Sequence, residues 1–210
     1  MRRMMVRAVL GLALAGGALP AAGQAVPGSD LPPAGFGVLN QDQLSVRFAA
    51  SDLEVRFLPL DERILRLIAN DGYDALKGLI ASRQAAIDSA VQLAGSGEPG
   101  LALVSFFALR SDARFDPENL NLVYHNQLYR PVGMVPVTGN FTGRQLAVRT
   151  QASAIYVFDR PIPVLEPFDL SYAGTQSSVW NEALRRIDRA RSQVLARWQA
   201  VQRDSTAPRP

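Results

Sequence analysis

Cysteine is absent from the chain. Without a thiol the protein forms no disulfide, holds no thiolate nucleophile and offers no cysteine ligand to zinc or iron. A chain of 210 residues does not depend on such links, because it is long enough to bury a hydrophobic core. Hydrophobic residues make up 48% of the sequence, which supports a globular domain with a core of its own.

Histidine is nearly absent as well, since His125 is the one histidine in the sequence. A Ser-His-Asp catalytic triad would need His125 as the general base, and the chain has no Gly-x-Ser-x-Gly motif to supply the nucleophile. His125 stands beside Asn126 between two short strand patterns. We therefore interpret His125 as a turn residue, and we assign no catalytic and no cofactor-binding residue.

The N-terminal segment has the three parts of a cleavable signal peptide. Arginines make its start positive, residues 8–19 are apolar, and small residues follow up to Gly23. The apolar part is too short and too rich in Ala and Gly for a membrane-spanning helix. We predict a signal peptide over 1–23, no transmembrane segment in the mature chain, and export to the periplasm or cell surface. The Arg2-Arg3 pair leaves the general secretory and twin-arginine routes both open.

Cleavage at that point would leave a neutral domain. The full chain has 22 Lys+Arg and 19 Asp+Glu, and the segment 1–23 holds three of the basic residues and none of the acidic ones. The two signs are therefore equal in number in the mature chain. Domains that bind nucleic acid carry a basic excess, so we expect no nucleic-acid partner.

The first half of the mature chain predicts a linker, a β-hairpin and a helical hairpin. Pro and Gly crowd residues 24–40, which we interpret as a flexible linker. Apolar and polar residues alternate along 44–57, as in two antiparallel strands. Two helical patterns follow within 60–94; Asp61 caps the first, and Asn70-Asp71-Gly72 separates them.

The second half changes to short strands punctuated by Pro, Gly and Asn. Such strand patterns fill residues 101–172 at a spacing of about ten residues, which favours an antiparallel sandwich. A long helix is predicted over 178–203, and a disordered polar tail over 204–210. We place one globular domain at 41–203. The apolar stripe of the long helix consists of Trp180, Leu184, Ile187, Val194, Leu195 and Trp198.

Part of this strand region resembles the immunoglobulin-like modules of bacterial exported and cell-surface proteins. Residues 115–122 (FDPENLNL) have the strand entry F-x-P-x-x-L-x-L, and 127–131 (QLYRP) contain the following Y-x-P strand. Residues 154–158 and 169–172 are similar to the closing strands of such modules. The resemblance covers about 100–175. It implies an α+β fold in which an antiparallel immunoglobulin-like β-sandwich carries the helical hairpin and the long C-terminal helix, and it implies no activity.

Arginine is concentrated on the C-terminal helix and its tail. Seven arginines stand there against Glu182 and two aspartates. Beside the apolar stripe, Arg185, Arg186 and Arg189 are the candidate contact residues for an envelope protein or an anionic membrane surface. The alternative is that the stripe packs on the domain and the arginines are only solvated, because a core-facing helix needs the same stripe.

Acidic residues form no assignable site. Four oxygen-bearing side chains between Asp112 and Asn119 have the ligand chemistry that calcium prefers, but their spacing is not that of an EF-hand. Asp116-Pro117 is also an ordinary turn opener, so we assign a turn and no metal. Caps and turns explain three close carboxylate pairs in the same way: Asp61/Glu62, Asp116/Glu118 and Glu166/Asp169.

The expected function is therefore that of an exported, non-catalytic binding or structural module of the bacterial cell envelope, with no cofactor. Two alternatives stay open, a carboxylate-dependent hydrolase of envelope polymers and a carrier of an apolar ligand. A deep cleft with convergent Asp or Glu would favour the hydrolase. An enclosed apolar cavity would favour the carrier, and neither feature would favour the module.

Overall fold

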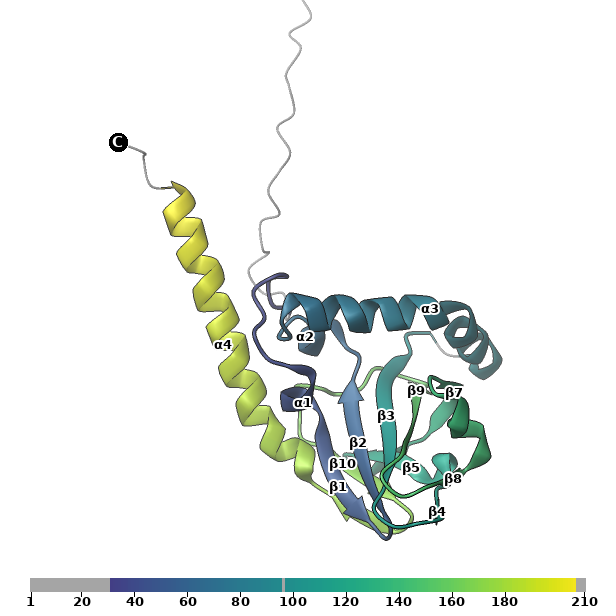
Figure 1. Cartoon of the computed structure of the whole chain (residues 1–210). Coiled ribbons are helices and arrows are strands. Elements are labelled where there is room, and N and C mark those ends of the chain that lie inside the picture. The colour runs from purple at the N-terminus through teal and green to yellow at the C-terminus, as the bar shows by residue number, and fades with distance from the viewer. Residues whose placement is uncertain (1–30, 96, 207–210) are drawn as a thin grey trace, which may run out of the picture.

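A computed structural model describes residues 31–95 and 97–206 of the protein (Figure 1). The predicted signal peptide, 1–23, and the first part of the predicted linker lie outside the described residues. The described chain has the predicted α+β character, with antiparallel sheets and a long C-terminal helix.

Five antiparallel strands form the larger sheet, in the order β1-β2-β3-β9-β7. Their bounds are β1 Val46–Ala50, β2 Leu53–Pro59, β3 Gly100–Ala108, β9 Gln151–Phe158 and β7 Pro131–Pro136. The hairpin predicted over 44–57 is confirmed: β1 pairs with β2, and Val46 lies opposite Phe57. This register places the alternating apolar residues of both strands on one buried face.

Four further antiparallel strands form the second sheet, in the order β11-β10-β5-β6. Their bounds are β11 Thr175–Ser177, β10 Asp169–Tyr172, β5 Leu120–Tyr124 and β6 Gln127–Tyr129. The short strands β4 (Ala113–Arg114) and β8 (Gln145–Leu146) pair separately. Two 3-10 turns complete this half, η1 (Pro117–Asn119) and η2 (Gly139–Gly143).

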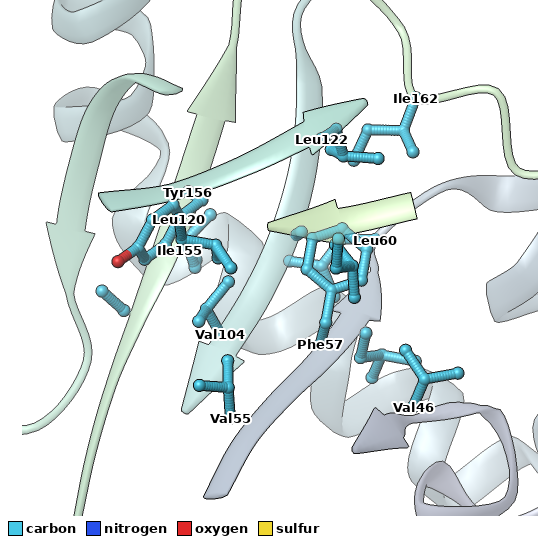
Figure 2. Packing of buried hydrophobic residues seen from close by; sticks show 14 of the residues in the cluster. Val46, Val55, Phe57, Leu60, Val104, Leu120, Leu122, Ile155, Tyr156 and Ile162 are labelled. Atoms are coloured by element: carbon cyan, nitrogen blue, oxygen red, sulfur yellow. The ribbon is translucent and has the colours of Figure 1, made fainter. Parts of the chain in front are cut away.

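Side chains of the five-stranded and the four-stranded sheets meet in one hydrophobic cluster (Figure 2). Phe106 of β3 stacks on Phe115 at 4.8 Å between ring centroids and lies 5.3 Å from Tyr172 of β10. Each fully buried phenylalanine or leucine contributes about 1.5–3 kcal/mol, so this contact between the sheets stabilises the fold. Their immunoglobulin-like sandwich character stays a prediction.

The helical region differs from the predicted hairpin over 60–94. The helix α2 (Glu62–Leu65) is a single turn capped by Asp61, and α3 runs from Asn70 to Ala94. Asn70-Asp71-Gly72 therefore begins a helix where the sequence predicted a break. The chain breaks earlier, because the backbone of 67–69 hydrogen-bonds to 38–39 instead of continuing α2.

Residues 31–40 also differ from the predicted flexible linker. Pro32 is buried, and Leu39 forms a parallel bridge with Ile68. Gly37 lies so close to this neighbour that an added Cβ would stand 2.2 Å from the carbonyl oxygen of Ile68. Asn40 then caps the short helix α1 (Gln41–Leu44) through a capping box. The end of the predicted linker is thus part of the domain.

The helix α3 crosses one end of the five-stranded sheet and packs on its strands β7 and β9 (Figure 1). Ala90 of α3 packs against Gly133 of β7, where an added Cβ would stand 2.6 Å from the Ala90 Cβ. The helix ends at Gly95, which has the left-handed conformation with a φ of 64°. The sequence predicted a helix end at this glycine, and glycine adopts this conformation without strain.

Candidate functional site

The helix α4 runs from Val179 to Thr206, and about three of its turns follow the last buried residue, Val194. Residues 204–206 are helical, which contradicts the predicted disordered tail for that part. In the first half of α4, one stripe of side chains is buried in the domain, and Trp180 stacks on Phe168 with ring centroids 4.9 Å apart. This stripe consists of Trp180, Ala183, Ile187, Ala190 and Val194.

Arg185, Arg186 and Arg189 lie exposed on α4, away from the buried stripe. Within residues 31–95 and 97–206, these three side chains have no ion pair or hydrogen bond. The structure therefore brings the three candidate residues together as free cations on one helix. In the first half of α4 the apolar stripe packs on the domain and is not available to a partner. This part of the helix therefore confirms the alternative given above, that the stripe faces the core.

The last three turns of α4 extend past the domain, and we call residues 195–206 the overhang (Figure 1). Leu195 and Val201 are 42% and 49% exposed, and Trp198 is half-buried. Sequence reasoning placed Leu195 and Trp198 in the same apolar stripe as Trp180 and Val194, interrupted at Arg191. It did not predict that the domain covers the helix only as far as Val194. The three- and four-residue spacing of apolar side chains shows which face of a helix is apolar, but not how much of that face the rest of the domain covers.

His125 lies in a two-residue turn between β5 and β6, since Tyr124 pairs with Gln127. His125 and Asn126 both have positive φ angles, 47° and 59°, which is the conformation that a type I′ hairpin turn requires. The imidazole stacks on the ring of Tyr124 with centroids 4.0 Å apart. The turn interpretation is confirmed.

The acidic cluster between Asp112 and Asn119 is held by turn contacts. The Asp116 carboxylate accepts hydrogen bonds from the Glu118 backbone N–H at 3.3 Å and from the Asn119 side chain at 3.1 Å. Arg144 forms an ion pair with Glu118 at 2.9 Å. Among the described residues, no group of three or more His, Cys, Asp or Glu side chains is placed to hold a metal ion. These oxygens are engaged by protein partners, as in an ordinary turn.

Three of the grooves on the surface of the described part of the chain are open to solvent. A groove of about 230 Å³ lies between α1 and the outer face of the sheet, one of about 320 Å³ lies beside α2, and one of about 450 Å³ lies beside η1. Each is lined by carboxylates that already have cationic partners: Asp42 with Arg47, Asp61 with Arg63, Glu62 with Lys77, and Glu118 with Arg144.

Glu62, beside α2, has the surroundings of a poor general acid. Desolvation by burial raises its pKa, but hydrogen bonds from Lys77 and Arg66 outweigh that effect, so the pKa lies below its usual value. The Lys77 Nζ is 2.7 Å from the Glu62 carboxylate, and the Tyr73 hydroxyl donates to the same carboxylate. A catalytic acid needs the opposite shift. The contacts of Glu62 tie α3 to α2.

No protein family model, curated protein or solved structure matches this chain. The search for membrane spans, which covered the described residues, finds no helix that is both long and apolar enough to cross a bilayer. The site therefore has to be interpreted from its own geometry. The features that stand out are the free arginines and the uncovered apolar end of the same helix.

Proposed function

We propose that the protein is an exported, non-catalytic binding or structural module of the bacterial cell envelope, located in the periplasm or at the cell surface. Its two antiparallel sheets would form an immunoglobulin-like sandwich that supports α4 as the contact element. The observation that carries the proposal is the group formed by Arg185, Arg186 and Arg189, three exposed arginines without partners in the described part of the chain.

The position of these arginines supports a contact role. The opposite face of the helix is fixed to the domain by Trp180 and Ile187, which are both fully buried, so the three cations are presented on a rigid support. Free cations on a fixed element favour an anionic partner and speed the encounter with it. An acidic envelope protein and an anionic membrane surface both have this chemistry.

The grooves support this function over the two alternatives. A glycoside hydrolase needs two carboxylates placed across a cleft, one of them with a raised pKa, whereas Glu62 is ion-paired and its pKa is lowered. A carrier of an apolar ligand needs an enclosed apolar cavity, and the three grooves are open.

The test is capture of envelope components by the mature protein and by a variant with Arg185→Gln, Arg186→Gln and Arg189→Gln. A charge-matched variant with Arg110→Gln, Arg114→Gln and Arg130→Gln, three exposed arginines outside α4, serves as the control. Vesicles of phosphatidylglycerol and phosphatidylcholine test the membrane surface in the same way. We expect binding by the wild type and the control and at least a tenfold loss with the α4 variant. Equal binding by all three proteins would refute the contact role.

A further inference from the structure

The groove between α1 and the outer face of the five-stranded sheet combines an apolar floor with a polar rim. Its volume is about 230 Å³. Its apolar residues are Leu58 of β2, Leu103 of β3 and Val137, which follows β7. We propose that this groove binds a sugar residue of a neutral saccharide. The inference goes beyond the α4 contact: it rests on the proposed envelope function for the source of the saccharide and on the groove itself for the chemistry.

A pair of serine hydroxyls in the groove can donate to a ligand. Ser105 of β3 and Ser153 of β9 lie directly opposite each other, and their Oγ atoms are 2.7 Å apart. Each hydroxyl has one hydrogen, and the bond between them uses one of the two. When Ser153, which is 4% exposed, donates to Ser105, the hydroxyl hydrogen of the half-buried Ser105 is available. The strand β3 is otherwise apolar (GLALVSFFA), so its single polar residue lies where the groove is.

Thr138 adds a second donor in a fixed position. Its Oγ1 accepts a hydrogen bond of 2.9 Å from the Ser153 backbone N–H, and its own backbone N–H donates to the Ser153 carbonyl at 3.2 Å. These two bonds hold the threonine beside the serine pair. Because Oγ1 accepts through a lone pair, its hydroxyl hydrogen is still able to donate. Donors that are fixed before a ligand arrives lose little entropy on binding.

The charges at this groove are balanced, which favours a neutral ligand. The Asp42 carboxylate lies 2.9 Å from the Arg47 guanidinium and 4.0 Å from that of Arg56. Arg56 also pairs with Glu54 at 2.8 Å. Two guanidinium groups are therefore matched by two carboxylates, and an ionic ligand would have to compete with one of them for its partner. The Asp42 side chain is 70% exposed, so its carboxylate can still accept a hydrogen bond from a ligand hydroxyl.

This combination fits a sugar better than an apolar ligand or a peptide. A sugar ring has hydroxyls that donate and accept, and its C–H groups pack on apolar side chains such as Leu58 and Leu103. An apolar ligand would leave the groove hydroxyls without partners, which is unfavourable once water is displaced. A peptide strand adds to an open edge of a sheet, whereas the groove lies over β2, β3 and β9, which are interior strands with neighbours on both sides.

An NMR titration of the mature protein tests the proposal. The probes are three neutral disaccharides: cellobiose, maltose and N,N′-diacetylchitobiose. Chitobiose without its acetyl groups is a cationic counterpart, and cellobiouronic acid is an anionic one. We expect saturable shifts of the Ser105, Thr138 and Ser153 amide signals with at least one neutral probe, and at least fivefold weaker binding of both charged sugars. No saturable shift with any neutral probe, or equal binding of a charged counterpart, would overturn the proposal.

Two variants remove the proposed contacts. Ser105→Ala with Thr138→Val deletes both donors, and its matched control, Ser82→Ala with Thr175→Val, changes two exposed hydroxyls outside the groove. We expect at least a tenfold loss of affinity in the first variant and none in the control. Because Ser153 loses its partner in the first variant, Asp42→Ala serves as a second test. Its side chain is exposed, so we expect an unchanged melting temperature and at least a threefold loss of affinity. Wild-type affinity in both variants would refute the site.

The α4 arginines separate this inference from the proposed contact role. Arg185, Arg186 and Arg189 do not line the groove, so the variant with all three changed to Gln should bind the disaccharide as the wild type does. Loss of sugar binding in that variant would overturn the assignment to the groove. Envelope capture that fails while the groove binds sugar would reject the α4 contact alone. Capture that succeeds while no neutral sugar binds would reject this inference alone.

Discussion

The Tyr156 hydroxyl donates a hydrogen bond of 2.8 Å to the backbone carbonyl of Pro117. Tyr156 is fully buried on β9, and Pro117 begins the turn that leads into β5. This bond therefore ties the five-stranded sheet to the four-stranded one. Burial raises the pKa of Tyr156 above its usual value, so the hydroxyl keeps its proton at neutral pH.

Replacing Tyr156 with Phe should destabilise the protein by about 1–3 kcal/mol, because the carbonyl of Pro117 loses its donor inside the core. The free energy of unfolding in urea measures this change. Tyr124→Phe removes a hydrogen bond to Glu166 that lies near the surface, and we expect a loss below about 1 kcal/mol there. A Tyr156→Phe protein as stable as the wild type would show that the bond does not join the sheets.

Gly133→Ala should cost about 1–3 kcal/mol, since the new Cβ would stand 2.6 Å from the Ala90 Cβ. Adding Ala90→Gly should recover part of that loss, which a double-mutant cycle of unfolding free energies detects. Gly78→Ala on the exposed side of α3, where a Cβ meets nothing within 4 Å, should instead stabilise by about 0.5–1 kcal/mol. Additive effects of the changes at 90 and 133 would contradict the close packing of α3 on β7.

Ala173→Asn should stabilise the hairpin of β10 and β11. Ala173 and Gly174 form its two-residue turn, with φ angles of 48° and 83°, and alanine is costly in this left-handed region while asparagine tolerates it. We expect a gain of about 0.5–1 kcal/mol in thermal unfolding. The same change at Ala49, which is exposed in the strand β1, should give no gain. Destabilisation at 173 would argue against the turn conformation.

The ion pairs of Glu62 predict a pH dependence. Because the pKa of Glu62 is lower in the folded protein than its usual value, its ionised form stabilises the fold above the pKa of the unfolded chain. That stabilisation disappears as the pH falls through the folded pKa. Glu62→Gln should therefore cost less than about 1 kcal/mol near pH 7, since water screens the partly exposed pairs. The wild type and variant should converge in acid; a constant difference at every pH would exclude an ionic origin.

The sequence predicts the strands well where one face of the sheet is buried. The alternation in β1 and β2 indicates both the hairpin and its buried face, because a one-residue slip would expose Phe57 and Val55. The strand β7 gave no such signal. It has Pro131 and Pro136 at its ends and Gly133 inside, and an edge strand tolerates these residues because its outer side makes no ladder hydrogen bonds.

The differences in the helical region have a tertiary origin. Asn70-Asp71-Gly72 is typical of a turn, yet it begins α3 because Leu67 and Ala69 pair with Leu39 just before it. No local pattern indicates a pairing over that distance. The arginine candidates on α4 were predictable from composition, whereas the overhang required knowledge of where the domain ends.

The strand order β1-β2-β3-β9-β7 also determines the order in which the fold is completed. β3 pairs with β2 soon after both have been synthesised, but its other edge has no neighbour until β9 is made, after residues 109–150. In the same way, one edge of β5 has no neighbouring strand until β10 is made. Such long-range pairing slows folding, and the open edge of β3 is the place where a growing chain is most exposed to aggregation. We therefore expect a chain truncated before β9 to need protection from a chaperone.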